Sequence, residues 1–265
     1  MEAENQAEWE APPPPEKIVV ETHEMSEIAT LGNIFLEPGR TFEDLRKKPR
    51  FVLATVIISL LVTGFAFGLY YKVGDAGMRR FMTEQIDKSP QSGSMSPEQK
   101  SNMVDMNMTI GSVVRYVMPL LVVISMLVGG LFYWLGAKAF GGTGGFLHGL
   151  STWVYASLPP SVVGMIANFI VLFFKSPDDI DIAASQRGVV NANPSVLFGS
   201  DASPVLVTLI SAFDIFLIWG WVLAAIGLRI TNKISSGSAW AITLIFALIG
   251  ITFRVIGAFF SGNPS

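Results

Sequence analysis

Side chains able to do chemistry are rare in the apolar parts of this sequence, and Asp214 is the most informative of them. It lies near the middle of an apolar run from Val205 to Leu228, which is long enough to cross a bilayer because about 20 apolar residues span the hydrocarbon. An aspartate at a helix centre costs about 2.5 to 3.5 kcal/mol on insertion scales, so it needs a partner, a hydrated cavity or a proton. Asp214 therefore predicts an integral membrane protein that keeps a charge inside the membrane.

Arg254, in the last apolar segment, is the expected partner of Asp214. At about 1.5 Å per residue, Asp214 lies roughly 14 Å in from Val205, and Arg254 lies roughly 9 Å from Phe260 on a helix that crosses in the opposite direction. Because these depths agree within the reach of the side chains, we expect a direct or water-mediated pair. A structural ion pair is the simpler interpretation, and a proton or ion path is the alternative.

A search for catalytic and metal-binding patterns finds none. His23 and His148 are far apart in the sequence and the chain contains no cysteine, so neither a catalytic triad nor a metal site is indicated. A net charge of -3 and the lack of a nucleic-acid motif argue against nucleic acid as a partner. We therefore expect a protein that is not an enzyme and that holds no metal and no cofactor.

The composition points to a multi-pass membrane protein. The chain is 51% hydrophobic and 15% charged, whereas a soluble domain has about 25% charged residues. Apolar segments long enough to span a bilayer predict an all-α bundle of five transmembrane helices within residues 51–262. These segments cover residues 51–71, 115–138, 148–174, 205–228 and 239–260.

The third of these segments contains two consecutive prolines, Pro159 and Pro160. Each proline removes a helix donor and clashes with the preceding turn, so we expect the third helix to kink or break there. The carbonyls freed near Tyr155 should face protein or a water-filled cavity, because lipid offers them no partner.

The residues before the first span divide into two parts. Residues 1–26 are acidic and proline-rich, which predicts a disordered tail. Residues 27–50 predict two short amphipathic helices separated by Pro38-Gly39, with Thr41 and Asp44 resembling a capping box for the second. Four cations stand directly before the first span and either fix the topology or contact lipid headgroups; these are Arg46, Lys47, Lys48 and Arg50.

The positive-inside rule places these cations, and with them the N-terminus, in the cytoplasm. An odd number of spans then places the C-terminus outside. In the first outside loop, Ser96-Pro97-Glu98-Gln99 has the cap residue, the early proline and the third-position glutamine that start a helix. This helix is expected to run directly into the second span.

Several motifs occur in an order that resembles the Yip domain, the family of Ypt-interacting membrane proteins, in its bacterial form. They are Leu31-Gly32-Asn33-Ile34-Phe35-Leu36-Glu37-Pro38 with Phe42 and Pro49, Ser96-Pro97-Glu98-Gln99, the glycine-rich residues 141–145 leading to Tyr155 and Leu158-Pro159, and Phe213-Asp214-Ile215-Phe216-Leu217-Ile218-Trp219 followed by Gly227-Leu228. The resemblance covers residues 30 to 260 and implies a five-helix domain with a cytoplasmic N-terminus in the bacterial inner membrane. Eukaryotic relatives contact small GTPases of the Rab type, but their Tyr-Gly-Pro-Leu-Trp signature is absent here, so Rab binding is not carried over.

Two functions follow from these observations. The first is a non-enzymatic scaffold or adaptor that engages lipid headgroups or a membrane or cytoplasmic protein partner, with homo-oligomers also compatible with the sequence. The second is a small transporter or channel subunit with a midplane site at the prolines and Asp214. A scaffold predicts a dry bundle in which Arg254 or a backbone group satisfies Asp214, whereas a transporter predicts a polar cavity that reaches Asp214.

Overall fold

The computed structural model describes residues 25–89, 92–180, 182, 190, 192–199 and 202–261, and all regular elements in these residues are helical. The predicted all-α membrane protein with five spanning helices is confirmed. The predicted tail, residues 1–26, lies almost wholly outside the described residues. The helices long and apolar enough to span are α3 (Val52–Lys88), α4 (Pro97–Ala139), α5 (Phe146–Phe174), α8 (Ile215–Asn232) and α9 (Ser236–Ser261).

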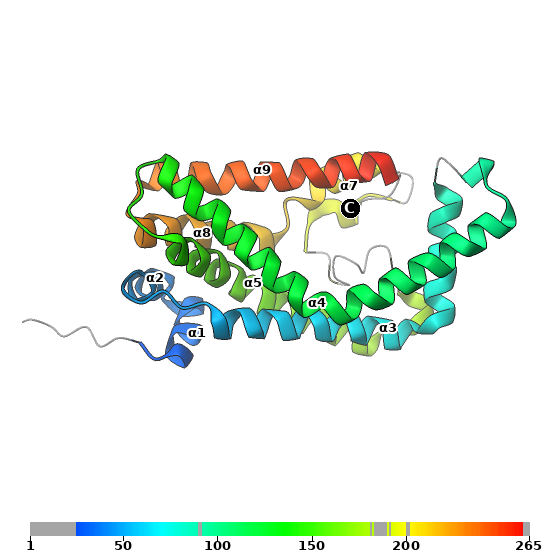
Figure 1. The fold of residues 1–265 in the computed structure, drawn as a ribbon, viewed down its shortest axis with the longest axis horizontal. Helices are drawn as coiled ribbons and strands as arrows, with labels where there is room; N and C mark the ends of the chain where they lie inside the picture. Colours follow the sequence, from blue (N-terminus) through cyan, green and yellow to red (C-terminus); the bar gives the residue numbers. More distant parts are fainter. Residues whose placement is uncertain are drawn as a thin grey trace, which may run out of the picture.

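Helix α3 changes direction at Gly74, just beyond the expected end of the first span. Gly74 has a φ of 72°, a left-handed conformation that glycine adopts without steric cost, and it joins two helical stretches. The second stretch leaves the bundle and runs beside the start of α4 (Figure 1). The predicted helix start in this region is confirmed, because Ser96 and Gln99 form a reciprocal capping box and α4 continues from there into the second span.

Two ion pairs hold this extended helical hairpin together. Arg79 contacts Asp105 at 2.6 Å, and Lys100 contacts Asp87 at 2.6 Å. A short 3-10 helix, η1 (Ser92–Ser94), lies between the two long helices. The connection between the first two spans is therefore mostly helical in its described residues.

The two expected N-terminal helices are present as α1 (Glu27–Leu36) and α2 (Pro38–Lys47). The predicted capping box of the second helix is wrong, because α2 begins earlier, with Glu37 as its cap residue. Thr41 donates instead to the Glu37 carbonyl within the helix, and Asp44 pairs with Arg50. Proline at the first helical position starts the helix here, since the N–H that it lacks would have no partner at that position.

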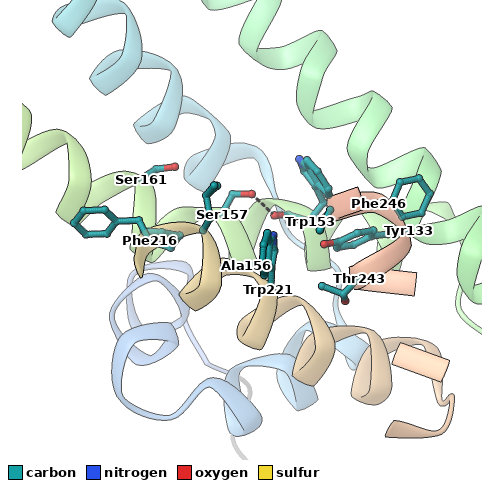
Figure 2. Close-up of a pocket in the computed structure, with 13 residues that line it drawn as sticks. Tyr133, Trp153, Ala156, Ser157, Ser161, Phe216, Trp221, Thr243 and Phe246 are labelled. Atoms are coloured by element: carbon teal, nitrogen blue, oxygen red, sulfur yellow. Dashed lines mark hydrogen bonds between the residues drawn. The ribbon is translucent and has the colours of Figure 1, made fainter. Parts of the chain in front are cut away.

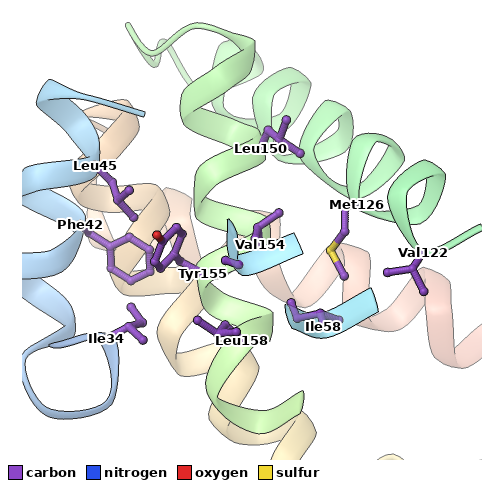
Figure 3. Close-up of a cluster of buried hydrophobic side chains, with 11 residues drawn as sticks. Ile34, Phe42, Leu45, Ile58, Val122, Met126, Leu150, Val154, Tyr155 and Leu158 are labelled. Atoms are coloured by element: carbon purple, nitrogen blue, oxygen red, sulfur yellow. The ribbon is translucent and has the colours of Figure 1, made fainter. Parts of the chain in front are cut away.

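Helices α1 and α2 contribute to the hydrophobic core of the bundle. Ile34, Phe42 and Leu45 are almost fully buried, and they lie next to α5, where Tyr155 is among their neighbours (Figure 3). Both helices thus bury one apolar face against the spanning helices. The other core members on α3, α4 and α5 are Ala54, Ile58, Val122, Met126, Leu150, Val154 and Leu158.

The fourth apolar segment differs from the expected single helix over residues 205–228. It consists of α7 (Pro204–Ser211) and α8, with a turn at residues 212–214 between them. The candidate fourth span is α8 alone, and it extends to Asn232. The break lies at Asp214, because its side chain caps the new helix.

The two prolines of the third segment do not end its helix. Helix α5 is uninterrupted from Phe146 to Phe174 and includes Pro159 and Pro160. Of the expected kink or break, a break is therefore absent at these prolines, and the next segment has a break of its own at residues 212–214.

The two ends of the bundle differ in the elements that they contain (Figure 1). One end carries α1, α2 and the turns that join α4 to α5 and α8 to α9, whereas α7 and the end of α9 lie toward the other. Two hydrogen bonds link the elements of the first end: His148 Nε2 lies 3.0 Å from the Arg46 carbonyl, and Thr143 N donates to the Asn232 carbonyl at 3.0 Å.

Candidate functional site

Asp214 occupies the N-cap of α8 rather than the middle of a spanning helix. Its Oδ1 accepts hydrogen bonds from the backbone N–H groups of Phe216 at 2.9 Å and Leu217 at 3.4 Å. Its Oδ2 accepts from Asn193 Nδ2 at 3.3 Å. A carboxylate is favourable at this position because the first N–H groups of a helix lack intrahelical partners and carry partial positive charge.

Arg254 lies on α9 near the same break. Its Nη2 donates to Ser211 Oγ, at the end of α7, at 2.9 Å. Arg254 does not appear among the hydrogen-bond or ion-pair partners of Asp214. A direct hydrogen bond or ion pair between the two side chains is therefore absent, whereas the water-mediated pair stays a prediction, since both side chains line the same cavity.

This cavity has a volume of about 310 Å³ and is lined mainly by α5, α8, α9 and the residues before α8. Val190 and Asn193 also line it, and two hydrogen bonds tie this part of the chain to helices: Val190 N donates to Asn168 Oδ1 at 2.9 Å, and Ile215 N donates to the Ala192 carbonyl at 3.1 Å. A polar cavity thus reaches Asp214. Its described lining residues are Pro160, Ser161, Gly164, Met165, Asn168, Val190, Asn193, Ser211, Asp214, Phe216, Leu217 and Arg254.

A second cavity of about 340 Å³ adjoins the first, and five of its described lining residues are aromatic, so we call it the aromatic half. The two cavities are neighbours, because Pro160, Ser161, Phe216 and Leu217 line both of them, and we call them together the α5/α8/α9 cleft. Figure 2 shows how side chains from α4, α5, α8 and α9 gather around the aromatic half. Its remaining lining residues are Tyr133, Trp153, Ala156, Ser157, Gly220, Trp221, Thr243, Phe246 and Ala247.

The proline pair lies on the wall of this cleft. Pro160 lacks the N–H that would bond to the Ala156 carbonyl, and Ala156 also lines the aromatic half. A Cβ built on Gly220 would stand 3.7 Å from Pro160 Cγ and 3.8 Å from the Ala156 oxygen. The freed carbonyl therefore faces α8 and the cleft, which is the kind of environment that the sequence predicted for it.

The other intramembrane residues selected from the sequence lie elsewhere. Tyr155 is 1% exposed and belongs to the core beside α2. Trp219 packs edge to face against Phe35 of α1, with ring centroids 6.3 Å apart. Pro159 is buried. Of the six selected residues, Pro160, Asp214 and Arg254 line the cleft.

Sequence reasoning missed most of the polar lining of the cleft. Ser161 and Asn168 are seven residues apart on α5 and so share a helix face, and both line the cavity beside Asp214. Polar residues repeating on one face of an otherwise apolar segment were the available signal. No such pattern pointed to Asn193 or Ser211, because these residues reach the site only through the helix break before α8.

The four cations before the first span have different roles. Arg50 forms a buried ion pair with Asp44 at 2.8 Å, and its Nη1 donates to the Met25 carbonyl at 2.6 Å. Its side chain is 9% exposed, so of the two roles expected for it, headgroup contact does not fit Arg50, and a role in topology stays a prediction. Lys47 and Lys48 are exposed and Arg46 is half-buried, so these three remain at the surface.

Comparison with known proteins gives a family match over most of the chain. The Yip1 domain matches residues 32–257, a range that includes the cleft and most of the two N-terminal helices. The chain is also 30% identical over 138 residues to the membrane protein YknW of Bacillus subtilis (strain 168), a match that covers 52% of this chain and 53% of that protein. The match thus spans about half the length of this curated relative. No solved structure matches the chain.

Proposed function

Because this chain belongs to the Yip1 domain family of membrane proteins, we propose that it is a non-enzymatic membrane scaffold that engages anionic lipid headgroups through one basic end of its bundle. The supporting observation is the docking of α1 and α2, which holds Arg46, Lys47 and Lys48 at the end that carries the α4–α5 and α8–α9 turns. We call this end, with Lys138, Arg229 and Lys233 from α4, α8 and the α8–α9 turn, the basic end.

The opposite end has no comparable excess of positive charge among its described residues. Its extended hairpin balances its cations with carboxylates, as in the Arg79–Asp105 and Lys100–Asp87 pairs. At the basic end, Lys138, Arg229 and Lys233 are exposed. This asymmetry supports a cytoplasmic position for the basic end, because cytoplasmic loops are enriched in Lys and Arg, and each cation near an anionic surface contributes about 1 kcal/mol.

Exposed apolar side chains accompany these cations. Ile28 and Leu36 on α1 are 78% and 83% exposed, although the same helix buries Ile34 in the core. Apolar side chains beside basic ones suit the boundary between headgroups and acyl chains. The basic end can therefore contact lipid by both charge and apolar insertion.

Native mass spectrometry of the full-length protein, released from nanodiscs that contain phosphatidylglycerol, tests this proposal. The triple change Arg46→Gln, Lys47→Gln and Lys48→Gln is expected to weaken phosphatidylglycerol retention about tenfold or more, given the contribution of each cation. The matched control removes three charges from the other end, with Arg79→Gln, Arg80→Gln and Lys100→Gln. Equal losses in both variants, or no loss in the first, would contradict the proposal.

The polar cavity at Asp214 supports transport as a second candidate. Transporter sites lie at broken helices near charged residues, and here the break before α8 lies beside Asp214 and Arg254. The sequence contains no cysteine, so Ser161→Cys provides a single thiol at the junction of the two cavities. A transporter predicts that membrane-impermeant reagents label this thiol from both sides of the membrane, whereas labelling from one side or neither would exclude alternating access.

A further inference from the structure

We infer that the α5/α8/α9 cleft binds one zwitterionic amphiphile, with its ammonium group at Asp214, its phosphate at Arg254 and its acyl chain in the aromatic half. This inference concerns the interior of the bundle. It does not depend on the proposed role of the basic end, because the two regions share no residue.

The first support is the separation of two opposite charges across one cavity. Asp214 and Arg254 both line the 310 Å³ cavity without contacting each other. Among the described residues, Asp214 Oδ1 accepts from two backbone N–H groups, whereas Oδ2 accepts a single long hydrogen bond, from Asn193 at 3.3 Å. A carboxylate oxygen accepts more than one hydrogen bond, so Oδ2 can still receive an ammonium N–H.

The anionic part of the ligand is assigned to Arg254. A guanidinium group has five N–H donors in a planar fork that suits phosphate oxygens. Ser211 accepts one of these donors, at 2.9 Å, and its hydroxyl also lines the cavity. The net charge of the pair is zero, which favours a zwitterion over an anion or a cation.

The second support is the largely apolar cavity that adjoins the first, with Pro160, Ser161, Phe216 and Leu217 in both linings. The aromatic half has a volume of about 340 Å³ and is lined by Trp153, Trp221 and Phe246, with no charged residue in its described lining. A free zwitterion such as an amino acid would leave this half without a ligand. A molecule with a polar head and an apolar tail matches both halves.

The depth of Arg254 agrees with a lipid headgroup. Arg254 lies roughly 10 Å before the end of α9 at 1.5 Å per residue, so its side chain can extend toward the nearer membrane surface. A lipid of that leaflet can bring its headgroup to Arg254 with a small inward displacement. Phosphatidylethanolamine has the ammonium, the phosphate and the chains that the cleft requires, and it serves as the probe.

Competition between lipids in native mass spectrometry tests the inference on the full-length protein. The triple variant Arg46→Gln, Lys47→Gln and Lys48→Gln serves as the parent, because it lacks the competing phosphatidylglycerol binding proposed for the basic end. In this parent we expect phosphatidylethanolamine to be retained about tenfold more strongly than phosphatidylglycerol, in line with a hydrogen bond to a charged group. Asp214→Asn keeps an N-cap side chain at α8 but removes the negative charge, so it should abolish this preference. Arg254→Gln should lower retention of both lipids at this site, while Arg115→Gln on α4, outside the cleft, serves as the matched control.

Two results would overturn the inference. One is a parent variant without preference between the two lipids, and the other is an Asp214→Asn variant that keeps the preference of the parent. Soluble glycerophosphoethanolamine provides a further arm, because it carries the headgroup without the chains. It should compete at least tenfold more weakly than the lipid, since burial of each CH₂ contributes about 0.8 kcal/mol, and equal competition would contradict the assignment of the aromatic half to a tail.

Discussion

Arg50 connects the two N-terminal helices, α1 and α2, to each other. Its guanidinium group connects Asp44 of α2, Thr30 of α1 and the carbonyl of Met25 at distances of 2.6 to 3.1 Å. Asp44 in turn accepts from the backbone N–H of Met25 at 3.0 Å. The cation that precedes the first span therefore orients both short helices from a single buried position.

Loss of one member of this pair should strongly destabilise the protein. Asp44→Ala leaves Arg50 buried without its carboxylate, and breaking a buried ion pair costs about 3 to 5 kcal/mol. The free energy of unfolding in a denaturing detergent titration would measure the effect. The control is Glu37→Ala, because the exposed Arg40–Glu37 pair, at 3.3 Å, should contribute less than about 1 kcal/mol. Similar losses in both variants would contradict the assigned role of Arg50.

Asp214 should be replaceable by another N-cap residue without loss of stability. Asn accepts from the same backbone N–H groups, so Asp214→Asn should leave the free energy of unfolding nearly unchanged, whereas Asp214→Ala should lower it by about 1 kcal/mol. The same detergent titration compares the two variants. Equal losses for Asn and for Ala, which both lack the carboxylate charge, would show that the charge, rather than the cap, stabilises the fold.

Asp214 also shows why part of the site could not be predicted from the sequence. An aspartate within an apolar run can lie inside one helix as a buried charge, or it can cap the start of a new helix. Hydropathy does not distinguish these two structures. Ala212 and Phe213 are apolar, so the turn before the cap has no polar signal. Ser96 was predictable because its proline and glutamine neighbours all indicate the same helix start.

Gly227 of α8 allows α2 to lie close to the bundle. A Cβ built on Gly227 of α8 would stand 2.8 Å from ring atoms of Phe42 and 2.7 Å from Thr152 Cγ2. Phe42 has no exposed surface, so it has no free space into which it can move. The absence of a side chain at Gly227 therefore permits α2 and α5 to pack against the same part of α8.

Gly227→Leu should release α2 from the bundle. The larger side chain overlaps Phe42, and overpacking typically costs about 1 to 3 kcal/mol, which should expose residues 27–50 to proteases. Limited proteolysis of the purified protein measures this exposure. Gly250→Leu on α9 is the control, because no atom lies within 4 Å of a Cβ at that position. Equal protection of both variants would contradict the packing role of Gly227.

Periodicity predicted α1 and α2 but not the surface against which they pack. Ile34 and Phe42 are buried, whereas Ile28 and Leu36 are exposed, although all four are large apolar residues in the same segment. An amphipathic pattern shows that a helix has an apolar face, and it does not distinguish lipid from protein as the partner of that face. The spans were predictable for a different reason, since length and hydropathy alone are what a bilayer requires.

The charges at the two ends of the helix bundle predict one orientation of the protein in the membrane. The basic end should face the cytoplasm, because Lys and Arg in short loops hold a segment on that side. The α3–α4 hairpin and the end of α9 should then face outside. Five spanning helices also place the basic end and the end of α9 on opposite sides.

Two single-cysteine variants can test this orientation, because the sequence has no cysteine of its own. Gly93→Cys lies in the α3–α4 hairpin and Gly237→Cys at the start of α9, and both positions are exposed. A Cβ at Gly93 meets no atom within 4 Å, and one at Gly237 meets only Ser235 Oγ, at 3.9 Å. In intact cells, an impermeant maleimide should label the cysteine at position 93, while the one at 237 should react only after the membrane is permeabilised. The opposite pattern would place the basic end outside, away from the anionic cytoplasmic leaflet on which its proposed function depends.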